Sequence, residues 1–101
     1  MVRKAAKAVS AFLGSPERHT GFVVNASAAV NAILRDAQVE RGDEILALDH
    51  GYGAVKQTMR HLAASREARF VEARISLPVS GPDAIVDAVA SAITSRTRLA
   101  V

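Results

Sequence analysis

The stretch EILALDHGYGAV, residues 44–55, decides the fold. Its aliphatic run ILAL, residues 45–48, is typical of a strand that is buried on both faces. A loop with glycines at positions 51 and 53 follows, and from Val55 onward apolar residues recur at helical spacing. A buried strand that leads directly into a helix indicates a parallel α/β sheet.

The same alternation extends in both directions from this stretch. Gly14 stands where a helix C-cap belongs, and Ser80 stands as the N-cap of a later helix with Pro82 in its first turn. The order of helices and strands predicts a three-layer α/β/α fold with a mainly parallel sheet and right-handed crossovers. Helices are expected at residues 2–13, 27–38, 55–62 and 82–95, and strands at residues 21–24, 44–48, 98–101 and, as a half-polar edge strand, 69–75.

Composition limits the class of protein. The chain has 101 residues, of which half are hydrophobic and 4% aromatic, and it has no cysteine, so disulfide scaffolds and disordered tails are excluded. No run approaches the roughly 20 apolar residues of a membrane span, and no secretory leader pattern follows Met1. We expect one α/β segment, residues 1–101, in the cytoplasm. The 13 Lys and Arg are mostly scattered, so neither nucleic acid nor membrane is an expected partner.

Two loops are candidates for chemistry because each lies between a predicted strand and the next helix. Ligands bind at that edge of a parallel sheet. In the first loop, the amides of Ser27 and Ala28 and the Ser27 hydroxyl could bind a phosphate, or Ser27 or Asn25 could simply cap the helix. The second, residues 49–53, places an imidazole and a phenol between glycines. Neither loop has a Walker or dinucleotide-binding pattern, and the three histidines lack metal-ligand spacing.

Four segments resemble the class V aminotransferase family, in order and with matching spacing. They are residues 21–34, 41–46, 49–55 and 97–101. Within the family, the chain is most similar to the isopenicillin N epimerase-like proteins, and the cysteine desulfurases are more distant. The resemblance runs over nearly the whole chain and is therefore more specific than any single motif.

The resemblance implies part of the large domain of fold-type I enzymes, which use pyridoxal 5′-phosphate (PLP). It places Ser27, with Ala26 before it and Ala28 after it, where these enzymes bind the phosphate of the cofactor. It places His50 where a ring stacks on the pyridine and assists proton transfer, so His50 is the one candidate catalytic residue. Tyr52 would line the same pocket. The intact enzyme would act on an amino acid substrate.

The resemblance also implies that this chain is inactive alone. Family members are about four times as long, and their Schiff-base lysine and their aspartate on the pyridine nitrogen come after the matched region. Lys4, Lys7 and Lys56 are expected on helix surfaces and stand in no family lysine context. In the family, the strand at residues 21–24 lies apart from the other three, so we expect the partner to be the remainder of the enzyme or a second copy in a homo-oligomer. The alternative function is a non-catalytic α/β binding or assembly module.

Overall fold

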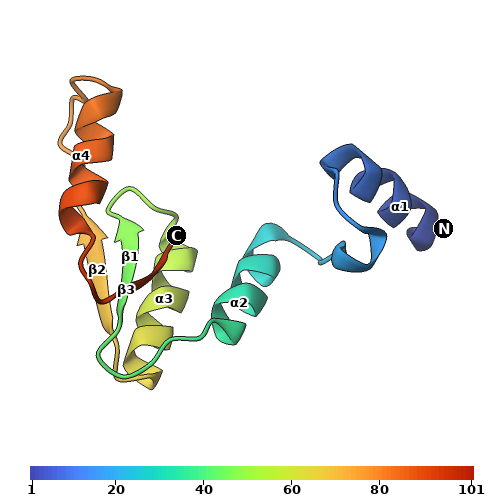
Figure 1. Ribbon diagram of the computed structural model, residues 1–101, viewed down its shortest axis with the longest axis horizontal. Coiled ribbons are helices and arrows are strands. Elements are labelled where there is room, and N and C mark those ends of the chain that lie inside the picture. The colour runs from blue at the N-terminus through green and yellow to red at the C-terminus, as the bar shows by residue number, and fades with distance from the viewer.

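The computed structural model describes residues 1–101, and Figure 1 shows a small sheet with helices beside it and a separate arm at the N-terminus. The chain alternates between helices and parallel strands, as the sequence predicts. Its elements are α1 (Val2–Leu13), η1 (Glu17–His19, a 3-10 turn), α2 (Ala26–Asp36), β1 (Glu44–Leu48), α3 (Gly53–Ser65), β2 (Arg69–Ala73), α4 (Pro82–Ala92) and β3 (Thr97–Ala100).

The sheet has three parallel strands in the order β2-β1-β3. Leu46 lies opposite Val71 on one side and Ala100 on the other, so β1 is the central strand. Its residues 44–47 are buried, which confirms the prediction of a strand enclosed on both faces. Both outer strands are sheet edges, and β2 is the half-polar edge strand that the sequence predicts.

Helices cover the two faces of the sheet, in three layers. The connection β1–α3–β2 runs one way along the sheet and β2–α4–β3 runs back, so right-handed crossovers put α3 and α4 on opposite faces. Ile45 and Ala47 pack with Met59 on the α3 side, where Leu34 of α2 joins the same core. Leu46 faces the other way and lines an apolar hollow of about 270 Å³ beside Val89 of α4. The predicted three-layer architecture is confirmed.

The start of α4 differs from the prediction in one detail. The N-cap is Gly81 in an extended conformation, without a side-chain bond, and Pro82 is the first helical residue. Ser80 therefore does not cap this helix. Proline accounts for the position of the start, because its fixed φ and missing N–H suit the first helical position.

The prediction of a strand at residues 21–24 is wrong. This segment is an extended connection between η1 and α2, and Phe22, Val23 and Val24 are exposed, Val24 at 91%. A strand forms only where another strand satisfies its N–H and C=O groups. The two open edges of the sheet are β2 and β3, and the connection between η1 and α2 lies away from both (Figure 1). The β-branched pattern alone did not supply a pairing partner.

The N-terminal arm folds back on itself and stands away from the body (Figure 1). α1 ends at Gly14 in the left-handed conformation, as predicted, and packs mainly on η1. Its buried residue is Ser10, whose hydroxyl donates to that of Thr20 at 2.6 Å, while Phe12 is 90% exposed. The arm gives the chain a radius of gyration of 16.5 Å, against about 13 Å for a compact chain of this length.

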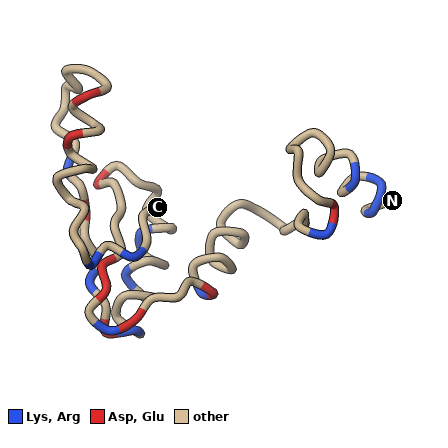
Figure 2. The backbone as a smooth tube through the Cα atoms, in the orientation of Figure 1, with Lys and Arg blue, Asp and Glu red and all other residues tan.

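Charged groups gather at the end of the sheet where the strands begin. Figure 2 shows Lys and Arg interleaved with Asp and Glu there. The buried Glu44 carboxylate accepts hydrogen bonds from Thr94 Oγ1 at 2.6 Å and from Arg96 at 3.3 Å, which tie β1 to the segment before β3. No helix of the chain has both the length and the apolar character needed to cross a membrane.

Candidate functional site at the carboxyl edge of the sheet

The first candidate loop ends in the N-terminus of α2. Asn25 is the N-cap, and its Oδ1 accepts from the Ala28 amide at 2.8 Å. The amides of Ala26 and Ser27 make no hydrogen bond, and neither does the Ser27 hydroxyl. Of the two cap candidates, Asn25 fills the role and Ser27 is left free. An eleven-residue helix with two open amides and a hydroxyl at its start suits a phosphate dianion.

A polar contact sets α2 and α3 side by side near their first turns. Asn31 Nδ2 donates to the Ser27 carbonyl at 2.9 Å, and Thr58 Oγ1 lies 3.2 Å from Asn31 Oδ1. Both helices run in the same direction, with their N-termini toward the carboxyl ends of the strands (Figure 1). The contact lies about one helical turn inside each N-terminus. Both candidate loops therefore lie toward the end of the molecule where the strands finish, although the first follows no strand and lies beyond α3.

The second candidate loop joins β1 to α3 and carries His50 and Tyr52. The His50 side chain is 48% exposed, and its Nδ1 lies 3.2 Å from Asp49 Oδ1. Tyr52 is 71% exposed just before the first helical residue. Gly51 closes the turn onto the Leu48 carbonyl, and a Cβ at that position would lie 2.9 Å from this oxygen. The glycine is needed for close backbone approach, while the two rings are open to a ligand.

A half-buried lysine supports the same loop. Lys56 is only 15% exposed, and its Nζ donates to the Asp49 carbonyl at 2.6 Å and to Glu72 Oε1 at 2.9 Å. Arg60 also pairs with Glu72 at 3.4 Å and stacks over the Phe70 ring. The hydrogen bond from Lys56, with the charges of Lys56 and Arg60, lowers the pKa of Glu72 below its ordinary value of 4.5. The expectation that Lys56 lies on a helix surface is therefore wrong, because α3 turns this residue onto β2.

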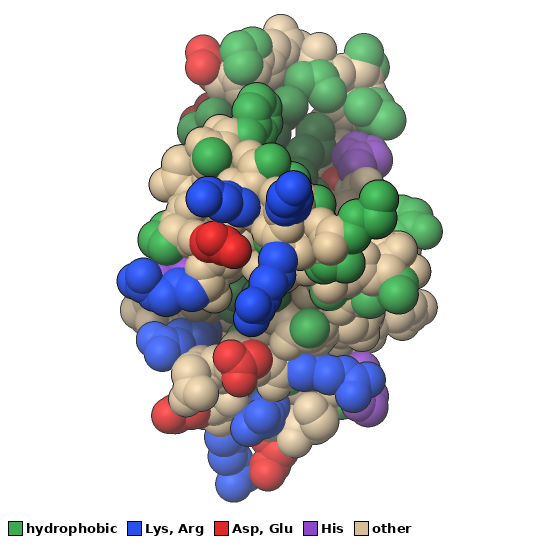
Figure 3. Space-filling view, turned by 90° about the vertical axis from the view of Figure 1, so that its right-hand side faces the viewer, with side chains coloured by type: hydrophobic (Ala, Val, Ile, Leu, Met, Phe, Trp, Pro, Cys, Tyr) green, Lys and Arg blue, Asp and Glu red, His purple; other side chains and the backbone are tan.

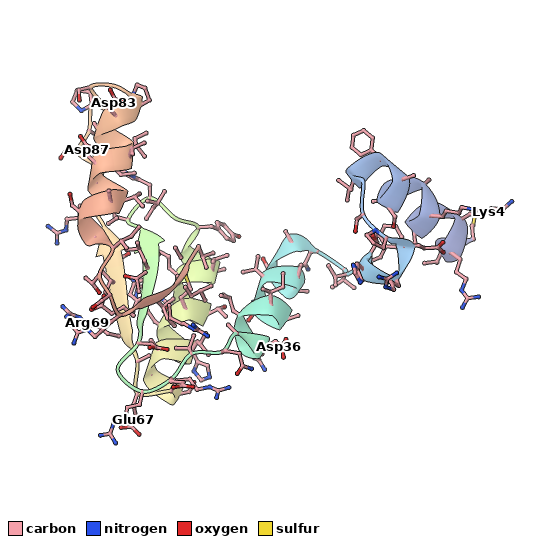
Figure 4. The ribbon with its side chains drawn as sticks, in the orientation of Figure 1. Lys4, Asp36, Glu67, Arg69, Asp83 and Asp87 are labelled. Atoms are coloured by element: carbon pink, nitrogen blue, oxygen red, sulfur yellow. The ribbon has the colours of Figure 1, made fainter.

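Several other charged residues and histidines lie away from the two loops. Lys4 is near the far end of the arm, remote from both loops, and Glu67 and Arg69 are at the opposite end of the sheet (Figure 4). His19 and His61 are exposed. A groove of about 480 Å³ lies between α2 and α3 and includes Arg35 and Arg66. Figure 3 shows hydrophobic side chains gathered on the upper part of one face and charged ones on the lower part.

Sequence reasoning found the two loops but missed the residues that support them. Asn31 bonds back to Ser27 within α2, whereas the contacts of Thr58 with Asn31 and of Lys56 with Asp49 exist only because of how the elements pack. Asp49 was visible as part of the loop, but its approach to His50 was not. One signal could have indicated the position of Lys56. It lies in the first turn of α3, three residues after Gly53 and three before the buried Met59, and therefore close to the apolar side of the helix.

Comparison with solved structures settles the fold. Two structures of C-DES superpose on 98% of this chain with a TM-score of 0.84 and 16% sequence identity. One is the cystine C–S lyase C-DES in complex with its reaction product cysteine persulfide, and the other is a lysine-to-alanine variant with glycine covalently linked to the PLP cofactor. The chain has the fold of part of a fold-type I PLP-dependent enzyme. The predicted resemblance to part of a PLP-dependent class V enzyme is confirmed, whereas the finer likeness to the isopenicillin N epimerase-like proteins stays a prediction.

Sequence comparison leads to a related protein. A putative L-cysteine desulfhydrase 1 from rice, Oryza sativa subsp. japonica, is 31% identical over 93 residues, which cover 84% of this chain. No protein-family model matches the sequence. The chain spans 19% of the rice protein and 26% of C-DES, so it corresponds to a segment of these larger proteins.

Proposed function

We propose that residues 1–101 form a segment of the cofactor-binding domain of a PLP-dependent enzyme that acts on a sulfur-containing amino acid. The observation that carries this proposal is the open N-terminus of α2, with its free Ala26 and Ser27 amides, at the same end of the molecule as His50. The similarity to a cystine C–S lyase and to a putative cysteine desulfhydrase supports the substrate class. Cytoplasmic location is part of the proposal.

The residues present fit the cofactor at two of its ends. Ala26 and Ser27 would bind the phosphate, with the Ala28 amide held by Asn25, and His50 and Tyr52 would lie against the pyridine ring. When bound, PLP supplies the electron sink for chemistry at the α-carbon of the substrate. The part of this chain is to bind and orient the ring, and to offer the His50 imidazole as a proton acceptor.

Binding is tested by NMR titration of the labelled 101-residue chain. We expect PLP and inorganic phosphate to shift the amide signals of Ala26 and Ser27, whereas pyridoxal, which has no phosphate, leaves them unchanged. Because Tyr52 is the only tyrosine and the chain has no tryptophan, intrinsic fluorescence reports on the second loop, and we expect PLP to quench it.

Two serine variants make this test specific. Ser27→Ala removes a hydroxyl donor to a charged phosphate and should weaken binding of PLP about tenfold. Ser95→Ala, at an exposed serine with no hydrogen bond, is the matched control and should bind as the unmodified chain does. Equal responses to PLP and pyridoxal, or equal losses in the two variants, would contradict the proposed phosphate site.

Catalysis is a separate part of the proposal. We expect the chain alone, supplied with PLP, to release no more sulfide from L-cysteine, and no more cysteine persulfide from L-cystine, than free PLP does, since none of its lysines lies in a family context. Lys4 is on the arm and Lys56 is engaged with Asp49 and Glu72. Sulfide release with many turnovers by the 101-residue chain would overturn this expectation.

Two finer alternatives are distinguished by the product and by the partner. An isopenicillin N epimerase-like enzyme, favoured by the sequence resemblance over the four matched segments, would invert the α-carbon of its substrate without sulfide release. A non-catalytic assembly module would use the open edges of β2 and β3 and would bind no PLP.

We further propose that the exposed apolar arm is covered by the remainder of the enzyme or by a second copy, which sedimentation of the intact enzyme would show.

A further inference from the structure

We propose that Lys56 and Asp49 are positioning residues that hold the His50 imidazole with its proton on Nδ1 and leave Nε2 free as a proton acceptor. The inference rests on the proposed function only for what Nε2 would meet, an acidic proton of an amino acid substrate. The arrangement itself is a property of this chain, formed by the carboxyl end of β1, the first turns of α3 and the inner side of β2.

The first step is the fixed position of the residue before His50. Lys56 brings a charged ammonium group into a site where it is only 15% exposed, and such a group is stable only with close partners. It has two, the Glu72 carboxylate and the Asp49 carbonyl. Lys56 therefore links the loop to β2, because the same ammonium group donates to the Asp49 carbonyl at 2.6 Å and to the Glu72 carboxylate.

The second step is the fixed orientation of the Asp49 side chain. The Asp49 amide donates to the Ala73 carbonyl at 3.0 Å, and Asp49 Oδ1 accepts from the Ile75 amide at 3.2 Å. Together with the contact to Lys56, the backbone and the carboxylate of Asp49 are both held by neighbouring segments. The carboxylate consequently has one position relative to the ring that follows it.

The third step is the effect of that carboxylate on the imidazole. Asp49 Oδ1 lies 3.2 Å from His50 Nδ1, and a negative oxygen at this distance favours a proton on the nearer nitrogen. In the neutral ring, Nε2 then carries the lone pair. A residue meant to take a proton from a substrate ammonium or thiol group needs this tautomer, and a ring left without an orienting partner would divide between both.

The experiment is nitrogen-15 NMR of the histidine rings in the ligand-free chain. It is recorded on the high-pH plateau of a titration, where the ring signals no longer change with pH. His19 and His61, which have no carboxylate partner, are internal references. We expect His50 to favour the Nδ1–H form about threefold to tenfold more than the two references do.

Two variants of α3 then separate positioning from stability. Lys56→Met removes the bond to Asp49 and the pair with Glu72, whereas Arg60→Met removes a pair with the same Glu72 but does not touch Asp49. We expect the His50 preference to fall to that of the references in the first variant and to persist in the second. Lys56→Gln replaces the first variant if circular dichroism shows that the methionine variant does not fold.

Each outcome decides the proposal. A His50 ring that matches the references in the unmodified chain, or equal loss of preference in the Lys56 and Arg60 variants, would overturn it. Because no cofactor is present, a negative result here leaves the PLP titration unaffected. Conversely, failure of PLP to shift the Ala26 and Ser27 amides would remove the proposed function while the tautomer result stood.

Discussion

Glu72 shows how the fold changes the properties of a single residue. In the sequence it is the one acidic residue of a half-polar strand. In the structure it receives Lys56 and Arg60 from α3 and lies in register with Ala47 of the central strand. These two cations favour the ionised carboxylate, so the pKa of Glu72 is lowered from its ordinary value of 4.5.

The lowered pKa predicts how stability depends on pH. A depressed folded-state pKa contributes stability that is present above the ordinary value of 4.5 and is lost as pH falls through the folded value. We expect Glu72→Gln to lower the urea midpoint at pH 7 and to flatten the decline of stability below pH 4.5. Urea titrations of both proteins across that range measure this. A decline of unchanged steepness in the variant would contradict the assignment.

At the scale of elements, the start of α2 separates two roles that the sequence left open. Asn25 satisfies the Ala28 amide, and the neighbouring Ala26 and Ser27 amides are left for a ligand. Capping and phosphate binding therefore coexist at one helix end, on different residues. A free Ser27 costs the helix little, because a helix needs its cap residue but leaves its first amides open in any case.

The separation of capping by Asn25 from phosphate binding by Ser27 predicts opposite effects of two substitutions at the start of α2. Asn25→Ala removes the cap bond and should lower the free energy of unfolding by about 1 kcal/mol, while Ser27→Ala should change it by less than about 0.5 kcal/mol. For binding of PLP the expected order reverses, since Ser27 supplies the hydroxyl. Urea unfolding followed by circular dichroism measures the first pair of effects. A stability loss in Ser27→Ala as large as that in Asn25→Ala would show that Ser27 shares the capping role.

At the scale of the whole molecule, the arm and the body are energetically separate. Eleven of the 101 residues are buried, and all but Ser10 of the arm belong to the body formed by the sheet, α2 and α3. The arm packs mainly within itself and leaves Phe12 exposed. Stability of the body should therefore depend on a few core residues and hardly on the arm.

Deletion of residues 1–20 tests this separation. We expect the deletion to change the free energy of unfolding by less than about 0.5 kcal/mol, because no core residue is removed. Met59→Ala, at a fully buried side chain in the core under the sheet, should cost about 2–5 kcal/mol and serves as the comparison. Urea midpoints and slopes give both values. A loss on deletion that approached that of Met59→Ala would mean that the arm packs on the body.

The sequence by itself determined the local architecture: the buried central strand at residues 44–48, the helices that flank it, the Gly14 cap and the two candidate loops. Hydrophobic period and turn residues act within a few positions and are therefore readable in the chain. Tertiary structure decided the unpaired state of residues 21–24, the choice of Asn25 as the cap and the bonds of Lys56 to Asp49 and Glu72. These features depend on which distant segment satisfies a backbone group or a charge, and only the packing of the helices on the sheet fixes that partner.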